Sequence, residues 1–162
     1  SKIAYDIALR IVKLNPDCAI DPEKIRIAAL LHDIGYGISP VDHEIHSVDL
    51  LQRHGHHEIA DITMHGYVYE RFLIQGKERT EFLPETLENK IVVYADFLFD
   101  QNNKILTMKQ RIARTSERLQ AHPEQFKAWS LAIPRFMELE TEIGSLMQTD
   151  SRSETRKKTI RE

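Results

Sequence analysis

The residues best suited to chemistry are an imidazole and a carboxylate that end an apolar run. Residues 28–35 read Ala-Ala-Leu-Leu-His-Asp-Ile-Gly, so His32 and Asp33 close a hydrophobic helical segment just before a glycine. Burying two such polar groups is costly unless something binds both, and a transition-metal ion accepts imidazole nitrogen and carboxylate oxygen together. The alternative is a structural histidine that caps the last carbonyls of the helix. The dipeptide alone leaves both interpretations open.

A second carboxylate, Asp96, lies in strongly apolar surroundings further along the chain. Hydrophobic residues flank it throughout residues 91–99. We therefore expect the Asp96 carboxylate to be fully buried, where an unpaired charge would be heavily penalised. Its partner is either a salt bridge or helix cap in the core, or the same metal ion that His32 and Asp33 face.

Further histidines are placed where they can join such a site. All but one of the eight histidines lie within residues 32–65. His43 comes at the start of a predicted helix, directly after the glycine-rich loop that leaves Asp33, and His65 is followed by Gly66. Helical proteins build dinuclear metal sites from ligands on several helices that project into the bundle core. These positions therefore favour a metal site over a helix cap.

Capping residues and apolar periodicity predict the helices that position these groups. Asp21 and Pro22 are typical of an N-cap and first helical position, and Gly55 is typical of a helix end. The helix after Pro22 is apolar on nearly every face, so we expect it to be central and buried. The expected helices cover residues 1–14, 23–33 and 41–53, a segment with Ile59, Ile62 and His65, residues 84–98, residues 107–122 after a break at 100–103, and residues 123–147 with a kink at Pro134.

Length and composition indicate one all-α domain, a single helical bundle. The chain has 162 residues, only six glycines and six prolines, and no convincing strand pattern or internal repeat. We expect the bundle to span residues 1–149, with a motif-bearing core at 1–103 and C-terminal helices at 104–149. Residues 150–162 are almost wholly polar, so we expect a frayed tail.

Charge and cysteine content exclude several classes of protein. A net charge of -3 gives no basic field for nucleic acid, and no apolar stretch approaches the roughly 20 residues that cross a bilayer. The single cysteine, Cys18, cannot form an internal disulfide, which favours a reducing cytoplasm. Apolar residues of the last predicted helix are expected to pack in the core or in a homodimer.

Taken in order, these motifs resemble the HD superfamily of metal-dependent phosphohydrolases, specifically its HDIG members. Residues 28–35 match the signature, and residues 43–51, 62–65 and 90–96 resemble the segments that follow it, so the resemblance covers roughly residues 1–103. It implies an HD-type fold and a set of metal ligands. The implied ligands are His32, Asp33, His43, His65 and Asp96, with His32 and Asp33 also catalytic.

The resemblance further implies one or two divalent transition-metal ions per chain, such as iron or manganese. Asp33 would bridge two ions about 3.5 to 4 Å apart. The first ligand of the family is a histidine, and residues 1–8 resemble the segment that directly follows it. We therefore expect a histidine immediately before Ser1; the alternative is that this protein has lost the first ligand.

The implied activity is hydrolysis of a phosphate ester or anhydride, in a nucleotide or small phosphorylated metabolite, by metal-activated water. Two alternatives are an HD-fold di-iron oxygenase and a metal- or ligand-binding regulatory module without turnover. Asp61 lies one helical turn before His65 and is expected to orient it. Arg71, Lys77 and Arg79 follow His65 and are candidate ligands for substrate phosphate.

Overall fold

Polar capping residues set the starts of three helices in the computed structural model, which describes residues 1–99 and 104–148. The Asp21 carboxylate accepts from the backbone N–H groups of the two residues after Pro22. Thr86 caps its helix in the same way, and Thr107 forms a reciprocal capping box with Gln110. The helices are α1 (Lys2–Leu14), α2 (Pro22–Leu31), α3 (His43–Arg53), α4 (His57–Ala60), α5 (Val68–Leu73), α6 (Leu87–Phe97), α7 (Met108–Leu119) and α8 (Pro123–Leu146).

The predicted all-α class is confirmed. Within the described ranges there is no β-strand, and only one isolated antiparallel bridge joins Phe99 to Ile105. Two short 3-10 helices, η1 (Ile34–Gly37) and η2 (Thr80–Phe82), complete the regular structure. None of the described helices is both long and apolar enough to cross a membrane. The predicted chain break at 100–103 and the polar tail at 150–162 fall outside the described residues.

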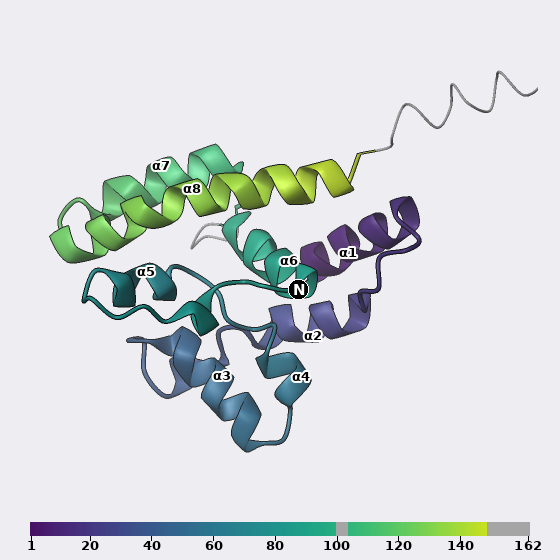
Figure 1. Cartoon of the computed structure of the whole chain (residues 1–162), viewed down its shortest axis with the longest axis horizontal. Helices are drawn as coiled ribbons and strands as arrows, with labels where there is room; N and C mark the ends of the chain where they lie inside the picture. The colour runs from purple at the N-terminus through teal and green to yellow at the C-terminus, as the bar shows by residue number, and fades with distance from the viewer. Residues whose placement is uncertain (100–103, 149–162) are drawn as a thin grey trace, which may run out of the picture.

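The helices form two groups that meet where α6 and α5 contact α8 (Figure 1). α7 and α8 pack side by side along one edge, while α1 and α2 pack together and both contact α6. α6 also contacts α8, and α3 lies at the opposite end from α7 against η1 and α4. Trp129 and Phe136 of α8 are fully buried against Phe97 of α6. This aromatic cluster therefore fixes the α7–α8 pair relative to the helices that carry the histidines.

Several predicted elements differ from the observed ones. α2 ends at Leu31, two residues early, and one of its sides faces solvent: the Leu30 residue is 62% exposed, so the expectation of an all-round buried helix is wrong. α3 starts at His43 rather than at residue 41. The helix expected to carry His65 stops at Ala60 and continues as turns, and the short α5 was not predicted.

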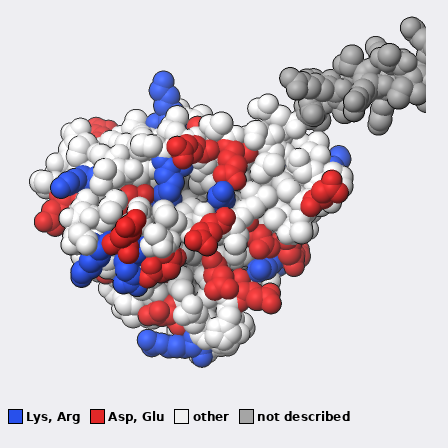
Figure 2. Space-filling view, in the orientation of Figure 1, with Lys and Arg blue, Asp and Glu red and all other residues white. Residues whose placement is uncertain are grey.

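Charged side chains of both signs are mixed over the visible surface. Figure 2 shows acidic and basic residues interspersed on the face drawn in Figure 1, with no continuous basic area. This distribution agrees with the weakly negative net charge of -3. On α8, Phe126 packs against the core, whereas Met137 is exposed, and the homodimer stays a prediction.

Candidate active site

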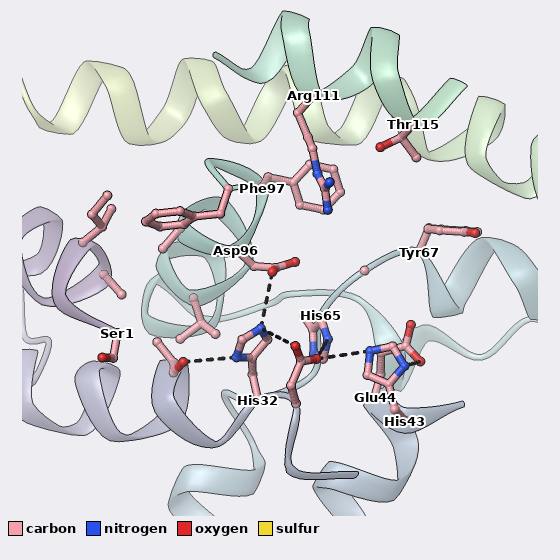
Figure 3. Close-up of a pocket in the computed structure, with 18 of the residues that line it drawn as sticks. Ser1, His32, His43, Glu44, His65, Tyr67, Asp96, Phe97, Arg111 and Thr115 are labelled. Atoms are coloured by element: carbon pink, nitrogen blue, oxygen red, sulfur yellow. Dashed lines mark hydrogen bonds and ion pairs between the residues drawn. The ribbon is translucent and has the colours of Figure 1, made fainter. Parts of the chain in front are cut away.

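The five side chains predicted to bind metal meet around one cavity. His32, Asp33, His43, His65 and Asp96 all line a cavity of about 500 Å³. Figure 3 shows the imidazoles of His32, His43 and His65 on one side of the cavity, with Asp96 above His32. The atoms of His32, Asp33 and His65 that could bind metal lie within 4.8 Å of one another. Residues 64 positions apart in sequence thus form one polar cluster.

Helix ends supply most of these side chains. His32 follows the last residue of α2, and Asp33 directly precedes η1. His43 is the first residue of α3, which packs against η1. Asp96 lies in the last turn of α6, which packs against α2. His65 comes from the turn between α4 and α5.

Asp33 is the centre of the cluster. Its Oδ1 lies 3.2 Å from Nε2 of His43 and 3.2 Å from Nε2 of His65. Its Oδ2 lies 3.5 Å from Nε2 of His32, and the same Nε2 lies 3.3 Å from Oδ1 of Asp96. Each histidine therefore presents Nε2 to a carboxylate.

The other ring nitrogen of each histidine faces the main chain. Nδ1 of His32 lies 3.1 Å from the carbonyl oxygen of Ala29, and Nδ1 of His65 lies 3.1 Å from that of Thr63. Nδ1 of His43 has a longer contact of 3.4 Å with the carbonyl oxygen of Pro40. Because a carbonyl only accepts, these contacts place a proton on Nδ1. The neutral rings then have a lone pair on Nε2, which is the form that binds metal.

The environment of Asp96 differs from the expected one. Its side chain is 26% exposed, so the prediction of a fully buried carboxylate is wrong. The flanking residues of α6 are buried as predicted, but Asp96 itself points into the cavity. Its partner in the structure is Nε2 of His32, 3.3 Å from Oδ1, rather than a group in the core.

Comparison with known proteins places this arrangement in a family. The profile of the HD domain family matches residues 2–98, which is more than half of the chain. The chain belongs to the HD domain family. Members of this family are generally phosphohydrolases and typically bind metal. The chain is also 29% identical over 155 residues to the uncharacterized protein MJ0778 of Methanocaldococcus jannaschii, covering 91% of this chain and 85% of that protein. No solved structure matches significantly.

The carboxylates and imidazoles of this HD domain shift one another's proton affinity. Burial raises the pKa of the Asp33 carboxyl, but hydrogen bonds from His43 and His65 outweigh burial and hold that pKa well below its ordinary value. Burial likewise raises the pKa of Asp96, and the hydrogen bond from His32 outweighs it, so the net shift is downward. Both carboxylates are therefore ionised over the physiological pH range.

The histidines shift in the opposite direction. Burial lowers the pKa of His32, but the hydrogen bond and charge of Asp96 outweigh it and raise that pKa above the ordinary 6.5. For His43, burial again lowers the pKa, and Asp33 and Glu44 raise it further than burial lowers it. In the metal-free protein, a proton on Nε2 thus competes with metal for the same lone pair.

This competition predicts that metal stabilises the HD domain more at high pH. Protonated His32 and His43 stabilise the folded protein because their pKa values are higher in the folded state. This stabilisation is fully present below pH 6.5 and is lost as the pH rises through the raised pKa values. Above these pKa values the Nε2 atoms carry no proton, so metal binds there without displacing one. The increase in melting temperature caused by manganese should therefore be larger at about pH 8 than at about pH 6. An equal or larger increase at the lower pH would contradict the assignment of these nitrogens.

Asn89 of α6 holds the turn that presents His65. Its Nδ2 donates to the carbonyl oxygens of Ile62 (2.9 Å) and Met64 (2.7 Å), and Asn89 is buried. The turn contains Gly66 at φ +72°, in the left-handed region, so no helix continues past His65 into α5. The side chain of a residue remote in sequence therefore determines the conformation of this ligand segment.

Replacing Asn89 with aspartate should loosen this turn. The change keeps the shape of the side chain but replaces the donor with an acceptor that faces two buried carbonyls. A loss of about 1–3 kcal/mol in the free energy of unfolding is expected, together with weaker metal binding. Chemical denaturation and metal titration measure the two effects. A control is Asn15→Asp at the C-cap of α1. Nδ2 of Asn15 donates to the carbonyl oxygens of Ile11 and Leu146, and this change should leave metal affinity unchanged.

The auxiliary residues predicted from sequence do not reach the cavity. Asp61 is exposed, and the carbonyl of Thr63, rather than Asp61, takes the Nδ1 proton of His65. Arg71 forms ion pairs with Asp42 (3.0 Å) and Glu44 (3.1 Å), which also explains its position beside the cavity wall. Neither of the loop cations lines the cavity: Lys77 is exposed, and Arg79 pairs with Glu81.

Other residues of the cavity wall escaped the sequence analysis. Arg111, Thr115 and Arg118 of α7 line it at helical spacings of four and three residues. Tyr36 stacks on the ring of His43, with centroids 3.9 Å apart, and Tyr67 lies on the cavity wall beyond His65. The spacing on α7 was visible in sequence, but nothing local indicates which face of that helix meets the cavity.

Proposed function

We propose that this HD-domain protein is a metal-dependent phosphohydrolase acting on a nucleotide or small phosphorylated metabolite. The observation that carries the proposal is the convergence of three imidazole Nε2 atoms and two carboxylates on one cavity. Mixed nitrogen and oxygen donors suit iron, manganese or a similar divalent transition metal better than magnesium or calcium. The proposed ligands are His32, Asp33, His43, His65 and Asp96.

The donors fit one or two ions. The two oxygens of Asp33 face different histidines, as a carboxylate shared between two metal ions requires. Bound metal would supply an acidified water and positive charge for the phosphoryl oxygens. Asp33, Asp96 and the three imidazoles in their neutral form would hold the ions, while the Nδ1 contacts keep the rings of His32 and His65 oriented before substrate arrives.

The start of α1 also supports the family pattern. Ser1 lines the same cavity as the histidine cluster (Figure 3). This position of Ser1 is compatible with the expectation of a further histidine ligand immediately before it.

The size of the cavity favours a small substrate. A volume of about 500 Å³ lies within the range of small-molecule sites in proteins. Aromatic Tyr67 is among its lining residues, next to the polar cluster. The cavity thus combines a surface for the organic part of a metabolite with a site for its phosphate.

Metal analysis and a substrate panel test the proposal together. Protein purified without chelators should contain one or two equivalents of transition metal, and it should release phosphate from at least one nucleotide or small phosphate ester. Chelation should abolish the release, and manganese or iron should restore it. Protein that binds no metal under these conditions would refute the proposal. Metal-dependent oxygen uptake without phosphate release would instead favour an oxygenase.

A further inference from the structure

A cationic side chain whose buried Nε atom has no hydrogen-bond partner among the described residues lies above the histidine cluster. This side chain is Arg111 of α7, which lines the cavity. Figure 3 shows its guanidinium directed from α7 toward Asp96 and the imidazoles. A buried donor that lacks a partner is costly, so its retention calls for an explanation.

Packing explains only part of the position of Arg111. The guanidinium carbon lies 5.7 Å from the centroid of the Phe97 ring, which supports the stem and one face of the group. Among the described residues, no carboxylate oxygen comes within the 4.0 Å of an ion pair with Arg111. By contrast, Arg71 and Arg135 each bind a buried glutamate. Within the described part of the chain, no carboxylate therefore neutralises the charge of Arg111.

The polar wall of α7 extends this cationic surface. Thr115 follows Arg111 by four residues and Arg118 follows Thr115 by three, so all three lie along one face of the helix. The facing wall carries the carboxylates of Asp33 and Asp96. The cavity is thus acidic where metal would bind and basic on the opposite side.

We propose that Arg111 binds a phosphoryl oxygen of the substrate from the side opposite the metal ligands. This inference rests on the proposed phosphohydrolase function and assigns it a substrate-binding residue outside residues 2–98, the part that matches the HD domain. The planar guanidinium has several N–H donors and suits phosphate geometry. A phosphate also supplies the missing acceptor for the buried Nε.

The same arrangement favours a phosphate monoester over a diester. If two metal ions and Arg111 each bind one non-bridging oxygen, a monoester supplies all three oxygens and a diester is one short. A monoester also carries about -1.5 to -2 charges at neutral pH, whereas a diester carries a single charge and has two non-bridging oxygens. The substrate class assigned here is a small phosphate monoester.

Inorganic phosphate is the probe that tests Arg111 directly. Calorimetry with metal-loaded protein should show phosphate binding that weakens about 10-fold or more in Arg111→Met and less in Arg111→Lys. The matched control is Lys109→Met, which removes a cation from an exposed position of α7 outside the cavity wall and should bind phosphate as the wild type does. Metal content should be the same in all four proteins. Should Arg111→Met fail to fold, the increase in melting temperature caused by phosphate is compared between wild type and Arg111→Lys, which should show the smaller increase.

Activity measurements separate this inference from the proposed function. The KM of p-nitrophenyl phosphate should rise in Arg111→Met by a similar factor, and the wild type should hydrolyse this monoester faster than bis-p-nitrophenyl phosphate. Unchanged phosphate affinity in Arg111→Met would overturn the role of Arg111, even in an active phosphohydrolase. Faster hydrolysis of the diester would overturn the substrate class. Phosphate binding that depends on Arg111 in a protein that hydrolyses no phosphate ester would refute the function but retain the anion site.

Discussion

Replacing Asp33 with asparagine should abolish hydrolysis while leaving the fold intact. Asp33 contacts all three histidines of the cluster, and its carboxylate is the group proposed to hold the metal. Its side chain is 47% exposed, so the substitution disturbs little packing. Losing several kcal/mol of metal-based stabilisation of the transition state corresponds to a rate decrease of about a thousand-fold. Steady-state kinetics and metal analysis of the purified variant measure the effect.

Asp61→Asn provides the matched control for this experiment. Asp61 is exposed and lies near His65 in sequence, but the main chain rather than Asp61 holds the Nδ1 of that histidine. The control should therefore keep the metal content and rate of the wild type. An Asp33→Asn protein that retained both metal and hydrolysis would place the active centre elsewhere. A decrease in the control equal to that in Asp33→Asn would show that the loss is not specific to the cluster.

Replacing Gly35 with alanine should damage the fold itself. A Cβ atom at Gly35 would lie 2.6 Å from the backbone nitrogen of Ser47 and closer still to the carbonyl oxygen of His43. Both atoms belong to the backbone of α3, so no side-chain rotation can relieve the clash. The contact between η1 and α3 would have to open, at a cost of about 3 kcal/mol. The expected fall in melting temperature is about 10 °C, and His43 would move away from Asp33.

Gly37→Ala tests whether the loss of stability comes from the close packing of α3 on Gly35 rather than from replacing any glycine of η1. A Cβ atom there meets nothing within 4 Å, although Gly37 lies in the same 3-10 helix. Gly37→Ala should therefore melt within a few degrees of the wild type. Equal melting temperatures for Gly35→Ala and the wild type would contradict the close packing of η1 on α3.

Local patterns were sufficient to predict most of the helices and the five clustered residues. Capping at Asp21 and Thr107 depends on side chains next to the backbone groups that they bind, so the sequence carries the signal directly. The family resemblance then grouped His32, Asp33, His43, His65 and Asp96, which the structure brings together. Their binding of metal stays a prediction.

Contacts between remote residues account for what sequence did not reveal. The turn at His65 is held by Asn89, and such a long-range contact overrides local helical periodicity. Arg71 is a reasonable phosphate ligand in sequence, but Asp42 and Glu44 already neutralise it. Arg111 instead reaches the cavity because the aromatic packing of α6 against α8 places α7 above Asp96.

The main-chain contacts of the histidine rings have a consequence for how this site tolerates change. Ala29, Pro40 and Thr63 orient the rings through carbonyl oxygens, which every amino acid possesses. Substitutions at these three positions that preserve the backbone conformation therefore leave the ring-orienting acceptor in place. A search for orienting side chains would therefore overlook how Nδ1 of His32 and His65 is held, whereas His43 also has the Tyr36 ring and the Glu44 carboxylate beside it.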